Sequence, residues 1–191
     1  MALTSLSSAV LAGGKGIRMG GQDKGLLLFQ NEPMIMPIAR ALKSISGSVF
    51  VNANRHVEEY LALGFEVVSD HQAYSEKGPL SGLLACLMRA DSSHLLVSPC
   101  DTPCITERAF MALIEASRIS PDKIHYLAGE SGNQPLHAIL PVQSALDKLK
   151  GFFDEAEKYN VMAFYEMFGC KSVFWDKEND FLNVNTQDSL L

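Results

Sequence analysis

The chain has 191 residues and a net charge of -6 at neutral pH, which allows one domain with a buried core and argues against broad nucleic-acid binding. No run approaches the roughly 18 consecutive apolar residues of a membrane helix, and the first eight residues lack the pattern of a secretory signal. We therefore expect a cytoplasmic protein without a membrane or nucleic-acid partner, and with its four cysteines as reduced thiols.

Short apolar segments alternate with longer segments of helical periodicity along the first two thirds of the chain. They predict strands at 9–12, 48–52, 65–69 and 94–98, and helices at 33–44, 57–63, 79–90 and 106–117. Strands that are apolar almost throughout and separated by helices are typical of a parallel sheet covered on both faces. Thr106 is the N-cap predicted for the helix that follows it.

The pattern changes in the last third of the chain. Two strands, 125–128 and 134–140, are separated only by the turn 129–133, which predicts an antiparallel pair. Helices at 142–150 and 161–168, a strand at 171–175 and the run 181–185 close the chain. The prediction is an α/β fold: a three-layer α/β/α domain with a mixed, mostly parallel central sheet.

A glycine-rich loop, LAGGKGIRMGGQDKG at 11–25, follows the first predicted strand. Glycines let successive backbone N–H groups approach one anion, and Arg18 and Lys24 add charge-assisted hydrogen bonds to phosphate. Two common phosphate loops do not fit, because Met19 replaces the third glycine of GxGxxG and Gln22 replaces the lysine of GxxxxGK[ST]. A polyphosphate site at the strand's carboxyl end is favoured over a solvated turn.

The same loop resembles the signature LAGGxxxRMGGxDKG of nucleotidyltransferases, in the form found in molybdenum cofactor guanylyltransferases. Further motifs follow in the expected order: VNANR at 51–55, Asp70, GPLSG at 78–82, PCDTP at 99–103, PLH at 135–137 and NVNT at 183–186. This resemblance spans nearly the whole chain. It implies a Rossmann-like fold of the nucleotide-diphospho-sugar-transferase type, one domain over residues 1–191, with 1–105 as the nucleotide-binding half and 106–191 as the acceptor-binding half.

The resemblance implies transfer of GMP from GTP to the terminal phosphate of Mo-molybdopterin. The products are molybdopterin guanine dinucleotide and diphosphate, and the cofactor is Mg²⁺. Gly13 favours guanine, because cytidylyltransferase relatives have alanine there. Partners implied are GTP, molybdopterin, a protein that delivers it and a molybdoenzyme that accepts the product. Two alternatives stay open: a related nucleotidyltransferase that uses a cytidine nucleotide or a sugar phosphate, and a non-catalytic GTP-binding module.

The predicted nucleotide site combines a metal ligand, two phosphate-binding cations and a set of contacts to GTP. Asp101 ends a buried strand and is the Mg²⁺ ligand expected, since Mg²⁺ prefers carboxylate oxygens; a cap for the next turn is the alternative. Together with Lys24 and Arg18 it forms the predicted catalytic group. The residues expected around GTP are Leu11, Ala12, Gly13, Gly14, Lys24, Asn52, Asp70, Gly78, Pro79, Leu80 and Asp101. Two alternatives remain open: Asp70 caps the following turn, and residues 78–82 serve only to pack the helix against a strand.

The acceptor side carries weaker signals. Asn183 and Asn185 alternate with apolar Val184 and so point to one face, and the resemblance puts them beside the acceptor. His137 is expected to be structural or to contact substrate. No general base is needed, because the attacking phosphate is already ionised and catalysis then depends on positioning and charge stabilisation.

Overall fold

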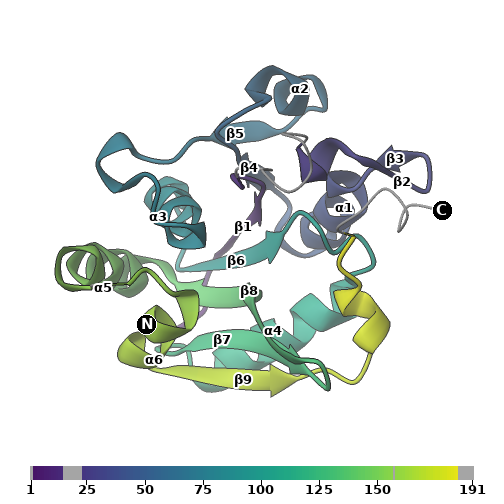
Figure 1. Ribbon diagram of the computed structural model, residues 1–191. Coiled ribbons are helices and arrows are strands. Elements are labelled where there is room, and N and C mark those ends of the chain that lie inside the picture. The colour runs from purple at the N-terminus through teal and green to yellow at the C-terminus, as the bar shows by residue number, and fades with distance from the viewer. Residues whose placement is uncertain (1, 15–22, 157, 185–191) are drawn as a thin grey trace.

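The computed structural model describes residues 2–14, 23–156 and 158–184. Within these ranges a seven-stranded sheet has the order β5-β4-β1-β6-β8-β7-β9 (Figure 1). The strands are β1 (Leu6–Leu11), β4 (Val49–Asn52), β5 (Glu66–Val68), β6 (His94–Pro99), β7 (Ile124–Gly129), β8 (Gly132–Pro141) and β9 (Cys170–Phe174). Only β8 runs against its neighbours β6 and β7 in this sheet. The predicted mixed, mostly parallel sheet is confirmed.

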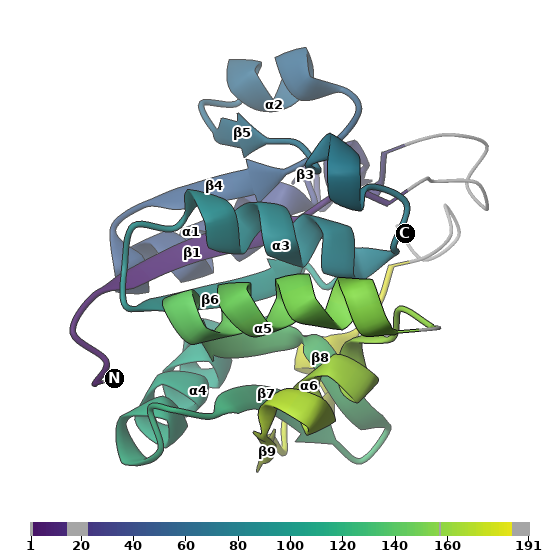
Figure 2. The ribbon, with the colours of Figure 1, turned by 90° about the vertical axis from the view of Figure 1, so that its left-hand side faces the viewer.

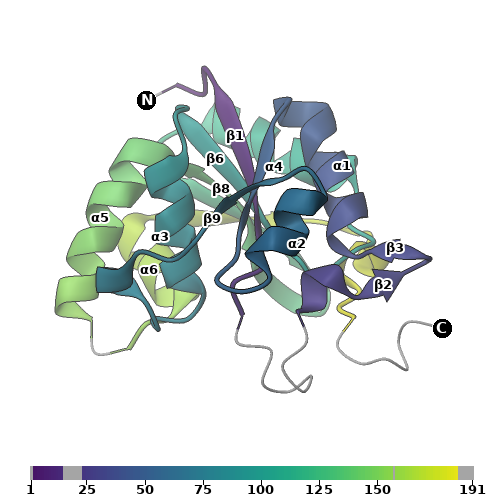
Figure 3. The same ribbon diagram turned by 90° about the horizontal axis from the view of Figure 1, so that it is seen from above.

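Helices cover both faces of the sheet. They are α1 (Ile35–Ser46), α2 (Val57–Ala62), α3 (Pro79–Arg89), α4 (Glu107–Ile119), α5 (Val142–Glu155) and α6 (Val161–Phe168). Figures 2 and 3 show α3, α5 and α6 on one face and α1 and α4 on the other. Side chains of β6 alternate between the two layers, as a strand requires: Leu95 and Val97 pack in the core under α3 and α5, and Leu96 packs in the core under α1 and α4.

Some local elements differ from the sequence prediction. A small ribbon of β2 (Leu28–Phe29) and β3 (Glu32–Pro33) was not predicted, because two-residue strands give no readable periodicity. Pro33 belongs to this ribbon, so the first helix begins at Ile35 rather than at 33. Thr106 stands at the N-cap position of α4, but its side chain accepts no cap hydrogen bond, and its hydroxyl donates to Asp180 (2.7 Å).

Three short 3-10 helices occur in the described chain. They are η2 (Lys24–Leu26), η3 (Gln72–Tyr74) and η4 (Glu178–Phe181). The last of these overlaps the predicted run 181–185, whose final residue lies outside the described ranges. None of the helices described here has the length and apolar character that crossing a membrane requires.

Strand register brings several loops to one edge of the sheet. Leu11 at the end of β1 faces Asn52 at the end of β4 and Pro99 at the end of β6. Because these strands are parallel, their following loops leave the sheet side by side. Strand β8 is antiparallel to β6, so its first half reaches the same edge. This is the edge where α/β sheets bind ligands.

An irregularity in β8 shapes this edge further. Tyr126 of β7 faces Ala138, but the next residue, Leu127, faces Gln134. Residues 135–137 are therefore left out of the ladder with β7 and form a bulge. Pro135 has no N–H to donate to a ladder, and bulges commonly redirect side chains beside active sites.

Close packing at this edge predicts opposite effects of two glycine substitutions. Gly82 lies in α3, and a Cβ there would overlap Oδ1 of Asn52, whose side chain is buried and held by hydrogen bonds. We expect Gly82→Ala to lower the free energy of unfolding by about 1–3 kcal/mol. Gly151 lies in α5 with open space around it, so Gly151→Ala should raise that free energy by about 0.5–1 kcal/mol. Urea unfolding of both variants checks this, and equal effects would contradict the packing.

Candidate nucleotide-binding site

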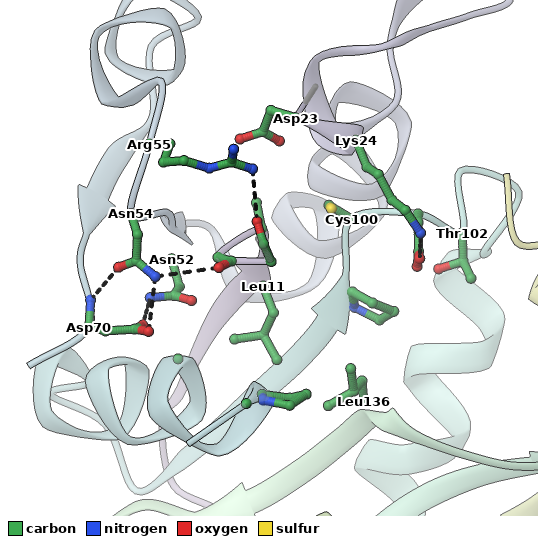
Figure 4. A pocket seen from close by; sticks show the side chains of 18 of the residues that line it. Leu11, Asp23, Lys24, Asn52, Asn54, Arg55, Asp70, Cys100, Thr102 and Leu136 are labelled. Carbon is green, nitrogen blue, oxygen red and sulfur yellow. Dashed lines mark hydrogen bonds and ion pairs between the residues drawn. The ribbon is translucent and has the colours of Figure 1, made fainter. Parts of the chain in front are cut away.

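A pocket of about 980 Å³ lies at the edge where β1, β4 and β6 end (Figure 4). Its walls are the loops after these strands and after β5, the turn η2, the start of α3, the bulge in β8 and Asn183. All the predicted GTP contacts line it except Leu80, whose side chain is fully buried in the core under α3. Two predicted residues, Arg18 and Asn185, lie outside the described part of the chain.

Lys24 reaches the pocket from a well-anchored turn. The carboxylate of Asp23 accepts from the Gly25 N–H (3.1 Å) and from the Tyr60 hydroxyl (2.5 Å). The side chains of Asp23 and Tyr60 are both buried. A Cβ on residue 25 would lie 2.5 Å from the Tyr60 hydroxyl, so glycine is required there. Burial, with Cys100 and Asp23 nearby, raises the pKa of Tyr60, so its hydroxyl stays a donor.

An ion pair joins this turn to the end of β6. Lys24 Nζ lies 3.0 Å from Oδ2 of Asp101, and the two side chains are 28% and 18% exposed. Both groups also line the pocket. The sequence predicted a phosphate contact and a metal ligand at these positions, and the fold brings the two together across the pocket floor.

Two loops are tied together by one carboxylate on the other side of the pocket. Asp70 accepts from Nδ2 of Asn52 and from Nδ2 of Asn54, each at 2.9 Å, and its own N–H donates to Oδ1 of Asn54 (2.8 Å). Figure 4 shows the side chains of Asn52 and Asn54 close to Asp70. They join the loop after β4 to the loop after β5.

The loop after β4 also holds the start of the glycine loop. Asn54 Nδ2 donates to the Gly13 carbonyl (3.4 Å), and the Arg55 guanidinium donates to the Gly14 carbonyl (3.0 Å). Both residues belong to the VNANR motif, but neither was predicted as a site residue. The signal that could have found them is their place directly after a strand whose end faces the glycine loop.

Charge in the pocket is unbalanced among the described lining residues. Two of them are cationic, Lys24 and Arg55, and four are carboxylates: Asp23, Asp70, Glu76 and Asp101. A polyphosphate would add more negative charge, so it requires accompanying cations.

The described residues contain no cluster of three His, Cys, Asp or Glu side chains able to hold a metal by themselves. Asp101 offers one carboxylate beside the space a triphosphate would fill. One carboxylate with phosphate oxygens and water is the donor set that Mg²⁺ typically has in nucleotide sites. The residues present therefore fit an ion that enters with the nucleotide.

His137, the last residue of the bulge, has a buried side chain that is hydrogen-bonded through both ring nitrogens. Nδ1 lies 3.2 Å from the Ser98 hydroxyl and Nε2 lies 3.1 Å from the Thr102 hydroxyl. Burial lowers the pKa of His137 to about 3. It is therefore neutral, and its contacts fix the bulge to the loop that carries Asp101.

The two cysteines at this edge are free thiols; Cys100 is buried and Cys104 is partly exposed. Burial raises the pKa of Cys100 and of Cys104. All four cysteines lie within the described ranges, and none forms a disulfide.

Comparisons with known proteins agree with this geometry. Residues 8–167 match the family of the MobA-like NTP transferase domain. The chain is 34% identical over 186 residues to the molybdenum cofactor guanylyltransferase of Haemophilus influenzae, covering 97% of this chain and 96% of that protein. It is 32% identical to the molybdenum cofactor guanylyltransferase of Polynucleobacter asymbioticus, with coverage of 97% and 94%.

Solved structures show the same fold. Molybdopterin-guanine dinucleotide biosynthesis protein A from Archaeoglobus fulgidus has a TM-score of 0.74 at 19% identity, covering 96% of this chain and 94% of that one. The 4-diphosphocytidyl-2C-methyl-D-erythritol synthase from Anaerococcus prevotii has a TM-score of 0.71 at 13% identity, covering 97% and 92%. The predicted fold class is confirmed by the mixed sheet with helices on both faces and by the superposition of these structures on most of the chain.

The low pKa of His137 predicts acid sensitivity. The unfolded chain takes up a proton at this residue near pH 6.5, and the folded chain does not until about pH 3. The contribution of His137 to the free energy of unfolding is therefore fully present above pH 6.5 and is lost as the pH falls. From pH 7 to pH 5 the loss is about 2 kcal/mol.

We expect His137→Gln to be less stable at pH 7 but to lose about 2 kcal/mol less than wild type on going to pH 5. Urea unfolding at both pH values measures this difference. Burial also lowers the pKa of His94 and His125. Their contribution to the pH dependence of stability is the same in wild type and variant, so it cancels in the comparison. The same pH dependence in both proteins would contradict a neutral, buried His137.

Proposed function

Because this chain belongs to the molybdenum cofactor guanylyltransferases of the MobA-like NTP transferase family, and is therefore a nucleotidyltransferase, we propose that it transfers GMP from GTP to the terminal phosphate of Mo-molybdopterin. The observation that carries the proposal is the Lys24–Asp101 pair, at 3.0 Å, on the floor of a pocket large enough for two substrates. The experiment below also distinguishes this activity from that of related nucleotidyltransferases that use other substrates.

Lys24 and Asp101 have complementary roles in this proposal. When GTP enters, the Lys24 ammonium leaves Asp101 and binds phosphate oxygens, which accept charge-assisted hydrogen bonds. Asp101 is then available to hold Mg²⁺, which supplies charge neutralisation on the α-phosphate and on the leaving diphosphate when it is bound. Arg18 is proposed as a second phosphate contact on the basis of the loop sequence.

The acceptor supplies the nucleophile without help from a base. An oxygen of the terminal phosphate of molybdopterin bonds to the α-phosphorus of GTP. The bond from that phosphorus to the bridging oxygen breaks, and diphosphate leaves with the electron pair. The attacking oxygen is already ionised, so no proton has to move. The chain's contribution is then positioning and electrostatic stabilisation, which agrees with a His137 that is occupied by two hydroxyls.

The nucleoside is proposed to lie on the side of Asn52 and Asp70. Guanine has N–H donors at N1 and N2 and an acceptor at O6, and we assign backbone groups of 11–13 to part of this recognition. The contacts of Asn54 and Arg55 with the Gly13 and Gly14 carbonyls fix that backbone. The N-terminus of α3 at Pro79 faces the same pocket and favours anionic or ribose oxygens.

The acceptor is proposed to lie on the side of the β8 bulge, where His137 and Asn183 line the pocket. This divides the chain into a nucleotide half, residues 1–105, and an acceptor half, residues 106–191, with Asn185 beside the acceptor as the sequence suggests. Transient contact with a molybdopterin-delivering protein and with a molybdoenzyme in the cytoplasm completes the proposal.

Parallel reactions with four nucleotides test the function directly. Mo-molybdopterin, Mg²⁺ and one of GTP, CTP, ATP or UTP are mixed with the enzyme, and diphosphate and the pterin product are measured. We expect GMP joined to the pterin with GTP alone, and no product with EDTA. Product with CTP would assign a cytidylyl transferase instead. Tight GTP binding without any turnover would indicate a binding module.

Removal of the pocket lysine should separate phosphate recognition from base recognition. We expect Lys24→Ala to weaken GTP binding about tenfold to a hundredfold, the worth of a hydrogen bond to a charged group, and to leave guanosine binding within about twofold. Calorimetric titration with each ligand measures this. The control is Lys43→Ala, on the exposed side of α1, which should bind both ligands normally. Equal losses for GTP and guanosine in Lys24→Ala would contradict a phosphate contact.

A further inference from the structure

The segment that follows β9 returns from the outer edge of the sheet to the pocket. We call residues 175–184 the C-terminal strap; it is the yellow segment of Figure 1 that rises from the end of β9. Trp175 begins it with a backbone N–H bonded to the Ala128 carbonyl (2.8 Å). Asn183, near its end, lines the pocket. The position of Asn183 therefore depends on what holds the strap.

Asp180 is the central anchor of the strap. Its side chain is buried, with the residue 6% exposed. Oδ2 accepts from the Thr106 hydroxyl (2.7 Å) and from the indole N–H of Trp175 (2.9 Å). Thr106 belongs to the loop between β6 and α4, which also carries Asp101. One carboxylate thus fixes the strap to the loop of the proposed metal ligand.

The strap is also seated on the hairpin of β7 and β8. The carboxylate of Glu178 accepts from the backbone N–H groups of Glu130 (3.1 Å) and Ser131 (3.2 Å). A Cβ on Gly129 would lie 2.5 Å from Glu178 and 2.8 Å from Phe181, so glycine at 129 allows this close approach. The Phe181 ring packs against His137, with centroids 5.9 Å apart.

A backbone hydrogen bond completes the connection at the pocket. The Val184 N–H donates to the Asp101 carbonyl (2.9 Å), and Val184 is almost fully buried. Asn183 stands between this bond and the Asp180 anchor. Both ends of this short segment are therefore fixed to the loop that carries Asp101, and the placement of Asn183 relative to Asp101 follows.

We propose that Asp180 is a positioning residue that sets the acceptor side of the pocket by holding Asn183 in place. The strap contacts the β6–α4 loop and the β8 bulge, whereas Asn52, Asn54 and Asp70 lie on the opposite wall (Figure 4). Asp101 itself stays held between the Cys100 N–H, which donates to the Leu11 carbonyl (3.2 Å), and the contact of Thr102 with His137 (3.1 Å). Loss of the anchor therefore affects acceptor binding and leaves nucleotide binding intact. The kinetic part of this inference rests on the proposed function, and the anchoring itself does not.

Hydrogen exchange tests the anchoring independently of any activity. We expect Asp180→Ala to speed exchange of the Val184 amide about tenfold or more, because a buried charged acceptor of two hydrogen bonds is removed. Asp180→Asn keeps an oxygen that can accept from Thr106 and Trp175, and should restore most of the protection. Thr106→Val removes one donor with little change in shape and should have an intermediate effect. The control is Asp176→Ala, an exposed position of the same strap.

Steady-state kinetics with GTP and Mo-molybdopterin test the consequence for the reaction. We expect Asp180→Ala to raise the KM for the acceptor about tenfold and to leave the Kd for GTP within about twofold, with Asp180→Asn close to wild type. Unchanged Val184 exchange in Asp180→Ala and Thr106→Val would overturn the anchor. Equal loss of GTP and acceptor binding would overturn the positioning role. A wild-type protein without guanylyl transfer would refute the proposed function, while the exchange result still decides the anchor.

Discussion

The register of three parallel strands is the constraint on which the site depends. Leu11 faces both Asn52 and Pro99, so the residues that follow β1, β4 and β6 emerge together. The glycine loop, the Asn54–Arg55 pair and Asp101 are far apart in sequence and meet only because of this register. A one-residue slip in any of these strands would move that strand's side chains to the opposite face of the sheet and would separate the groups that the pocket combines.

The second feature of the site is that its lysine forms an ion pair with one of the carboxylates that line the pocket. Lys24 and Asp101 are paired at 3.0 Å and partly exposed, so each can exchange its partner at modest cost. A triphosphate with a divalent cation offers a new partner to both. In the proposed function, this exchange lets a pocket whose carboxylates outnumber its cations among the described residues accept an anionic substrate.

Much of the fold could be predicted from the sequence, because buried parallel strands are apolar runs and the helices between them have clear periodicity. The hairpin of β7 and β8 was equally readable from its turn. The sequence did not predict the ribbon of β2 and β3, whose strands have two residues each. The bulge at 135–137 was missed too, since its register depends on the neighbouring strand. Leu80 was predicted beside GTP from a motif, whereas its side chain belongs to the core. Asn54 and Asp180 act through contacts with residues distant in sequence, and no local pattern reports such contacts.

In the proposed function, the Lys24–Asp101 pair opens to receive the nucleotide. A crystal structure with Mg²⁺ and a GTP analogue that resists cleavage between the α- and β-phosphates tests this most directly. We expect Lys24 Nζ to move from Asp101 to phosphate oxygens, Asp101 to coordinate the metal, and guanine to lie beside Asn52 and Asp70. An intact Lys24–Asp101 pair, with the triphosphate bound elsewhere on the chain, would contradict it.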